Sequence, residues 1–308
     1  MGSILTGATV HLVLLLLLPP LLLGVINRTK AWFGGRCGPP LLQPYFDLIK
    51  LLRKDMVLST TTSWVFRVGP IITLAAVVLA GLLVPLGPFD APIAFTGDLI
   101  LFAYLLALAR FFTTSAALDT GSAFEGMGAA REVTFACLAE PALFLALLVL
   151  IRVSDSLTLT GMLHGPVGGF PAEAAAPLVL VAIGLFIVLL AETCRIPVDD
   201  PNTHLELTMI HEAMVLDHSG PLFGVILYAG ALKLFVLGAL LLHVVAPFRT
   251  GAPYLDCPLF IVEILGLAVV VGVVESVMAR LQMRHVPSLL VAAMLLCGFG
   301  FLLLMRQS

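Results

Sequence analysis

Apolar residues gather in eight long runs along this chain of 308 residues. Each run approaches or exceeds the roughly 20 mostly apolar residues that a helix needs to cross the hydrocarbon core of a bilayer. Gly/Pro-rich segments such as GPFDAPIAFTGD separate several of the runs, and such segments are typical of loops. The pattern predicts an all-α, multi-pass membrane protein, with residues 1–308 as one polytopic domain. The predicted spans are 4–26, 70–88, 99–118, 133–151, 174–191, 221–245, 258–278 and 287–305.

Composition agrees with a bilayer environment and narrows the function classes. Hydrophobic residues make up 60% of the chain and charged residues only 11%, against about 25% charged in ordinary soluble domains. The net charge of -3 is small and scattered, so no nucleic-acid partner is expected. The five cysteines are far apart and form no CxxC pair, which indicates neither an iron–sulfur cluster nor a disulfide framework. Any redox centre is therefore expected on another polypeptide.

The distribution of lysine and arginine predicts how the spans are oriented. If the N-terminus is outside, eleven basic residues fall in inner loops, three fall on the outer side, and Arg110 and Lys233 lie inside spans. Basic residues concentrate in cytoplasmic loops, so this asymmetry predicts both termini outside and the 27–67 segment in the cytoplasm. The inner residues are Arg28, Lys30, Arg36, Lys50, Arg53, Lys54, Arg67, Arg131, Arg195, Arg280 and Arg284.

The cytoplasmic 27–67 segment contains an amphipathic stretch, LLQPYFDLIKLLRKD. Leu41, Tyr45, Leu48 and Leu52 have helical spacing, with basic residues on other faces. This pattern predicts a helix that lies along the membrane surface. Two interpretations remain open, a plain surface connector and a helix on which a partner docks.

Five charged residues interrupt the predicted spans: Arg110, Glu140, Lys233, Glu263 and Glu275. A charge at the bilayer centre costs at least about 2.5–3.5 kcal/mol on insertion scales, so each needs a partner, water or a function. In one interpretation, the first three neutralise one another in a buried polar patch. In the other, they belong to a hydrated path that carries protons. Glu275 lies near the inner end of its span, where it could join a cytoplasmic-side network.

The segment 192–220 is predicted to be an acidic cytoplasmic loop. Between positions 192 and 217, six acidic residues face one basic residue, Arg195, although inner loops are normally basic. Prolines at the start of the segment break the preceding helix, and the pattern predicts a new helix from Thr203 to Leu216. Such a cluster is either a solvated loop face or a group that steers protons or binds a soluble partner. The six acids are Glu192, Asp199, Asp200, Glu206, Glu212 and Asp217.

Three histidines in the same segment do not predict a metal site. His204, His211 and His218 are seven residues apart, so neighbours on a helix would be separated by about 10.5 Å, too far to share one ion. Interface hydrogen bonding or proton relay is the favoured interpretation. No metal or other cofactor is expected in this chain.

Three stretches carry a family resemblance: AETCRIPVDDPNTHLELTMIHEAMVLDHSG, GRCGPPLLQPYFDLIKLLRKD and GAAREVTFACLAEP. Together they resemble the subunit 1 family of proton-pumping NADH dehydrogenase. The chain is more closely similar to the corresponding membrane subunit of energy-converting [NiFe]-hydrogenases, such as hydrogenase-4 and formate hydrogenlyase. The resemblance covers nearly the whole chain. It implies eight spans with an outside N-terminus, in the inner (plasma) membrane of a bacterium or archaeon.

The resemblance also implies partners and roles. The chain would anchor the peripheral redox arm, touching the hydrogenase large subunit and iron–sulfur subunits, and join them to antiporter-like membrane subunits. Iron–sulfur clusters and the [NiFe] centre would lie in those partners. Glu192, Asp199, Glu206 and Asp217 would belong to an acidic funnel that couples redox chemistry to ion movement. The full expected coupling path is Glu140, Glu192, Asp199, Glu206, Glu212, Asp217, Lys233 and Glu275, and the expected docking residues are Arg36, Lys50, Arg53 and Lys54.

Two departures from the NADH dehydrogenase pattern favour the hydrogenase branch. Members of that family typically read GPNR after the first span, whereas this chain has Gly38, Pro39, Pro40 and Leu41. They also tend to carry a glutamate early in the sixth span, where this chain has Gly230. Two other functions stay open, a quinone-binding subunit of NADH-quinone oxidoreductase and a stand-alone ion or solute transporter.

Overall fold

The computed structural model describes residues 2–164, 174–199, 209–246 and 253–307. Over these residues the chain is helical, and eight of the helices are long and apolar enough to cross a membrane, which confirms the predicted number. The helices are α1 (Gly2–Phe33), α2 (Gln43–Leu52), α3 (Trp64–Leu83), α4 (Asp98–Asp119), α5 (Ala123–Ser154), α6 (Leu159–His164), α7 (Ala175–Glu192), α8 (His211–Met214), α9 (Gly220–Val245), α10 (Pro253–Val277), the 3-10 helix η2 (Met283–His285) and α11 (Val286–Gln307).

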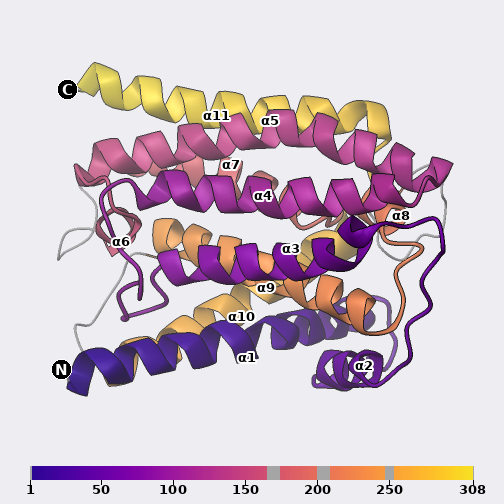
Figure 1. The fold of residues 1–308 in the computed structure, drawn as a ribbon. Helices are drawn as coiled ribbons and strands as arrows, with labels where there is room; N and C mark the ends of the chain where they lie inside the picture. The colour runs from indigo at the N-terminus through magenta and orange to yellow at the C-terminus, as the bar shows by residue number, and fades with distance from the viewer. Residues whose placement is uncertain (1, 165–173, 200–208, 247–252, 308) are drawn as a thin grey trace.

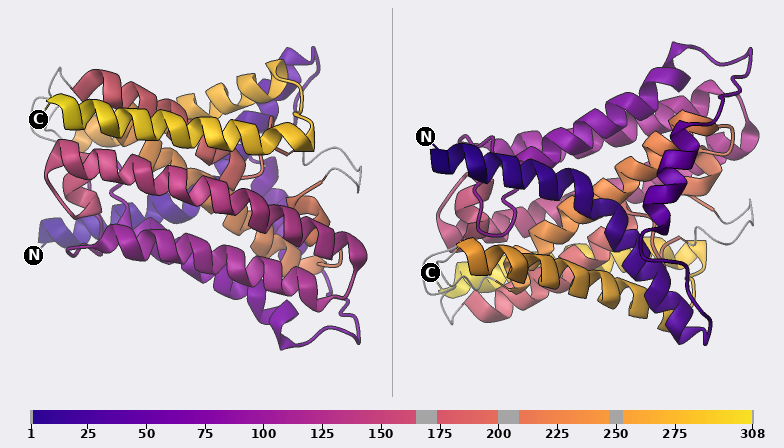
Figure 2. Two further views of the ribbon diagram at one scale, coloured as in Figure 1. Left: turned by 90° about the horizontal axis from the view of Figure 1, so that it is seen from above. Right: turned by 90° about the horizontal axis from the view of Figure 1, so that it is seen from below.

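The long helices lie side by side in one bundle, with both termini at the same end and α2 and α8 at the other (Figure 1). We call the second end the α2 end. Within α9, 72% of the most apolar window is buried, compared with 22% in the last span, so α9 occupies the centre of the bundle. Figure 2 shows it crossing between the other helices. The middle of α9 therefore lies inside the protein.

Three helices begin well before the apolar runs that predicted them. α3 starts at Trp64, α5 at Ala123 and α10 at Pro253, whereas the runs begin at 70, 133 and 258. The start of α3 is set by a cap: Asp119 Oδ2 accepts the backbone N–H groups of Ser63 (2.7 Å) and Phe66 (3.3 Å). Charged residues near these helix starts, such as Arg67, Glu132 and Asp256, interrupt the apolar pattern, so a hydropathy window places the start later. Because α5 begins at Ala123, Glu132 lies within this helix.

The predicted amphipathic helix is present as α2, packed across α1 and α9 at the α2 end (Figure 1). The Tyr45 hydroxyl donates to the Leu17 carbonyl in α1. On the α9 side, Tyr228 donates to the Leu16 carbonyl at 2.7 Å. Pro20 has no N–H with which to bond that carbonyl inside α1, so the tyrosine supplies the missing donor.

The segment after α7 folds back against the bundle. Cys194 ends the helix with a left-handed φ of 51°, and the Arg195 N–H closes the last turn on the Leu190 carbonyl at 2.8 Å. Asp199 is only 1% exposed. The sequence pattern predicts a helix from 203 to 216, and the described part of this stretch is helical only over 211–214, as α8. Residues 209 and 210 are not helical.

A glycine on α5, Gly128, allows α8 to pack closely against that helix. A Cβ at Gly128 would lie 2.8 Å from the Ile210 carbonyl oxygen and 3.0 Å from Ala213 Cβ. The 210–214 backbone therefore rests directly on α5. This contact places His211, the first residue of α8, close to α5.

Candidate functional site

Five charged side chains from four helices meet inside the bundle, and we call them the central cluster: Arg110 (α4), Glu132 and Glu140 (α5), Glu192 (α7) and Lys233 (α9). The Arg110 guanidinium contacts all three carboxylates, with Nε 3.5 Å from Glu132 Oε1 and the two terminal nitrogens on Glu140 and Glu192. Lys233 Nζ lies 2.7 Å from Glu192 Oε2. The two oxygens of Glu192 thus contact two different cations.

Neither interpretation of the span charges describes this arrangement completely. Arg110 does pair with Glu140, but Lys233 pairs with Glu192. Three carboxylates against two cations give the ionised cluster a charge of -1, so it is not a closed neutral patch. Burial differs sharply within it, since the Glu192 side chain is 5% exposed and the Glu140 side chain is 42% exposed. The cluster therefore runs from the protein interior to the outer face of α5.

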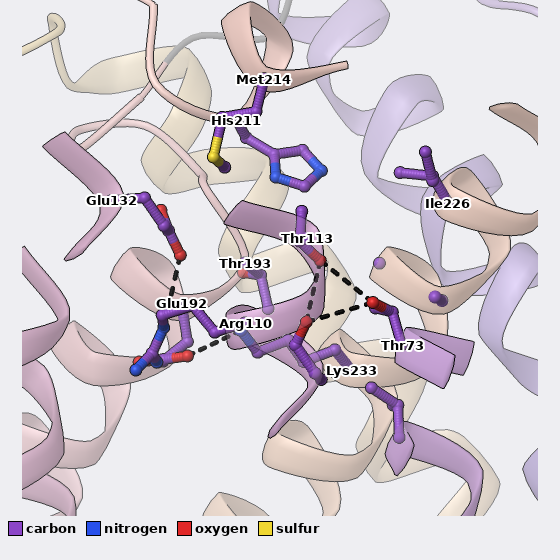
Figure 3. Close-up of a pocket in the computed structure, with 14 residues that line it drawn as sticks. Thr73, Arg110, Thr113, Glu132, Glu192, Thr193, His211, Met214, Ile226 and Lys233 are labelled. Carbon is purple, nitrogen blue, oxygen red and sulfur yellow. Dashed lines mark hydrogen bonds and ion pairs between the residues drawn. The ribbon is translucent and has the colours of Figure 1, made fainter. Parts of the chain in front are cut away.

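Cavities lie on both sides of the cluster. The inner cavity, about 70 Å³, is lined by Arg110, Glu132, Glu192, Lys233 and His211 together with threonine and apolar side chains. Figure 3 shows these side chains converging from separate helices. The lateral cavity, about 200 Å³, lies between α4 and α5 and includes Glu140. Arg110 and Glu192 line both cavities, so their ion pair separates one from the other.

Hydroxyl groups hold α3 against α4 beside the cluster. Thr73 lies 3.1 Å from Thr113, and the hydroxyls of both lie within hydrogen-bonding distance of the Ala109 carbonyl, at 3.1 and 2.9 Å respectively (Figure 3). Ala109 directly precedes Arg110 in the chain. These bonds therefore join α3 to α4 next to Arg110.

A second network, the inner cluster, joins the segment after α7 to α1 and the end of α10. Glu275 pairs with Lys30 Nζ at 2.7 Å and with Arg195 Nη1 at 3.2 Å, and its side chain is fully buried. Asp199 pairs with Arg280 at 3.3 Å. Glu275 therefore belongs to a network of charged side chains, as predicted, and this network lies at the α2 end of the bundle.

Asp199 also organises the chain before α8. Its Oδ2 accepts the backbone N–H groups of Ile210 and His211, both at 3.1 Å. One carboxylate therefore connects Arg280, just after α10, with the residue whose ring lines the inner cavity. The inner cluster and the central cluster approach each other at His211.

The remaining predicted residues lie apart from these clusters or outside the described residues. Asp217 is exposed, and its backbone N–H donates to buried Glu125 at 3.0 Å. Glu212 lies on α8. Glu206 falls outside the described residues, as do Asp200 and His204. The predicted docking residues are all exposed at the α2 end, and they are Arg36, Lys50, Arg53 and Lys54.

Sequence reasoning missed Glu132 and did not assign Arg110 to the coupling path. Glu132 lies just before the predicted start of its span, so the hydropathy pattern leaves it outside the bilayer. A signal was available, since Glu132 and Glu140 are about two helical turns apart and could approach one cation from the same helix. In the described part of the chain, no group of three or more His, Cys, Asp or Glu side chains could hold a metal ion.

Comparison with known proteins agrees with the motifs. The family model described as NADH dehydrogenase matches residues 6–306. Formate hydrogenlyase subunit 4 of Escherichia coli (strain K12) is 32% identical over 92% of this chain and 91% of its own length. Hydrogenase-4 component C of the same organism is 32% identical over 92% of each chain.

A solved structure reproduces the fold. A chain of the membrane-bound sulfane sulfur reductase, an archaeal respiratory membrane complex, superposes with a TM-score of 0.84 over 98% of this chain and 99% of its own, at 20% identity. The similar architecture extends over the whole helical bundle described above. The chain is therefore a multi-pass membrane protein that belongs to the NADH dehydrogenase family.

Proposed function

We propose that this chain is the membrane anchor and coupling subunit of a hydrogenase or formate hydrogenlyase complex. In this role it holds a peripheral redox arm at the α2 end and links electron transfer to movement of protons or sodium ions through the bundle. The hydrogenase large subunit, iron–sulfur subunits and antiporter-like membrane subunits are its partners, and they carry the [NiFe] centre and the clusters. Two relatives with 32% identity bear the names formate hydrogenlyase subunit 4 and hydrogenase-4 component C, which supports this choice.

The observation that carries the proposal is the central cluster. A charge inside a membrane-spanning bundle is costly, and such residues typically pair and mark ion pathways. Here Arg110 and Glu192 separate two cavities, while Glu140 extends the cluster to the outer face of α5. An ion entering from the α2 end would meet alternating carboxylates and cations whose pairing can change.

The docking half of the proposal rests on charge at the α2 end. Most basic residues of the described segments lie there, and by the positive-inside rule this end faces the cytoplasm. Replacing Lys50 and Lys54 together by glutamate should release the peripheral subunits at lower salt than in the wild-type complex. The control is Arg306→Glu, an exposed charge reversal at the opposite end. Equal retention of the peripheral subunits in both variants would contradict docking at the α2 end.

The coupling half is tested by Glu192→Gln, which keeps the shape of the side chain and removes its charge. The complex is purified through this chain, its subunits are identified, and ions moved per hydrogen formed are measured in vesicles. The ratio should fall, because Lys233 and Arg110 lose their shared counter-ion. An unchanged ratio would count against coupling through the central cluster. Purification as a functional lone protein would favour the transporter alternative, and sensitivity to quinone-site inhibitors would favour the quinone-linked one.

A further inference from the structure

His211 lies between the two clusters. Its backbone N–H donates a hydrogen bond to Asp199 Oδ2 of the inner cluster, at 3.1 Å. Its ring lines the inner cavity together with Glu132 and Lys233 of the central cluster. Figure 3 shows the imidazole directed into the space that these side chains enclose. A single residue therefore contacts the network at the α2 end through its backbone and faces the buried charges through its side chain.

The ring suits proton transfer by its chemistry. Burial, together with the nearby Lys233 ammonium and His218, lowers the pKa of His211 to about 4, so the imidazole is neutral at physiological pH. A neutral imidazole has one nitrogen that donates and one that accepts. The cavity of about 70 Å³ has room for more than one water molecule between the ring and the carboxylates.

We propose that His211 is the proton relay between the α2-end surface and the central cluster, an inference that rests on the proposed coupling function. A proton from water binds the accepting ring nitrogen, and the proton on the other nitrogen leaves to a cavity water and then to Glu132. Charge balances, since one proton enters and one leaves, and no electron moves. Rotation of the ring restores the starting tautomer.

Asp199 is the positioning residue of this relay. It holds the N–H groups of Ile210 and His211 and is itself paired with Arg280, so its contacts set the ring at the cavity. Gly128 permits the close approach of this segment to α5. The charged groups that line the cavity with the ring are Arg110 from α4, Glu132 from α5, Glu192 from α7 and Lys233 from α9.

The test is chemical rescue in the complete complex. His211→Ala is purified with its partner subunits and reconstituted in vesicles, and proton transport is measured with and without added imidazole. Transport should fall on the order of 100-fold, the typical contribution of a positioned proton-transfer group. Imidazole should restore much of it, because the free ring can occupy the space that the substitution opens. A purely structural defect would not respond to imidazole.

His218→Ala is the matched control. His218 is also a buried histidine of the same segment, but its ring stacks on Phe66 at 4.0 Å and does not line the inner cavity. Its variant should transport protons at the wild-type rate with or without imidazole. If His211→Ala does not assemble, His211→Gln decides instead, since it keeps a polar side chain and should still lose transport.

The outcomes separate the two proposals. A wild-type complex that forms hydrogen without moving ions would overturn the coupling function itself. A wild-type complex that moves protons, with His211→Ala or His211→Gln doing so equally fast, would overturn only the relay. Loss of transport in an assembled His211→Ala complex without any response to imidazole would likewise overturn the relay.

Discussion

Lys233 Nζ lies 2.7 Å from Glu192 Oε2, which joins the centre of α9 to the last residue of α7. The side chains are 14% and 5% exposed, so the pair is largely shielded from solvent. Glu192 also contacts Arg110, so this one carboxylate pairs with both cations of the central cluster. A change in protonation at this carboxylate would alter both ion pairs at once.

Removing the charge of Lys233 should strongly reduce both the stability of the protein and ion transport. Lys233→Met leaves Glu192 with Arg110 alone and changes the charge of the ionised cluster from -1 to -2. Breaking a buried pair on one side typically costs about 3–5 kcal/mol. We expect a lower melting temperature of the purified complex and loss of ion transport. Lys233→Arg is the control, because it keeps the charge and should retain more of both properties.

The close contact between α5 and α8 predicts a strong difference between two neighbouring glycines. Gly128→Ala would place a methyl group 2.8 Å from the Ile210 carbonyl oxygen, so the segment carrying His211 has to move. Gly126→Ala meets only Leu118 Cδ2, at 3.9 Å. We expect the first variant to lower proton transport and thermal stability and the second to leave both unchanged. Equal behaviour of the two variants would contradict the packing described here.

Glu275 should be important for stability. Glu275→Gln removes the charge that Lys30 and Arg195 share and leaves two cations beside a neutral amide. The cost should again be about 3–5 kcal/mol, because the carboxylate is fully buried. Thermal unfolding of the detergent-solubilised complex measures the effect. Glu263→Gln, on the same helix but outside the inner cluster, should unfold at nearly the wild-type temperature.

His218 predicts a specific sensitivity to acid. Burial lowers its pKa to about 4 in the folded protein, whereas an unfolded histidine titrates near 6.5. Between these values only the unfolded chain binds the proton, so this residue destabilises the fold as the pH falls from about 6.5 to about 4. His218→Phe removes that proton uptake and can still stack on Phe66. Its melting temperature should fall less between pH 7 and pH 5 than that of the wild type, and an equal fall would contradict the assignment.

In the described part of the acidic segment 192–220, the local sequence pattern does not predict the secondary structure correctly. Polar and apolar residues after 200 have helical spacing, yet the described part forms only the four-residue α8. The N–H groups of Ile210 and His211 donate to Asp199. The same segment also packs closely against Gly128 of α5. These tertiary contacts satisfy the backbone without a long helix, and a local propensity does not include them.

The sequence by itself determined the eight long helices, their order and the amphipathic α2, because a bilayer requires long apolar helices and a surface helix requires one apolar face. It also identified Arg110, Glu140 and Lys233 as charges within the spans that need partners. Only the tertiary structure decided which charges meet. Arg110 and Lys233 lie far apart in the chain, and their shared contact with Glu192 depends on which helices are neighbours and how each is rotated about its axis. Hydropathy carries no information on either, since side-chain packing sets both.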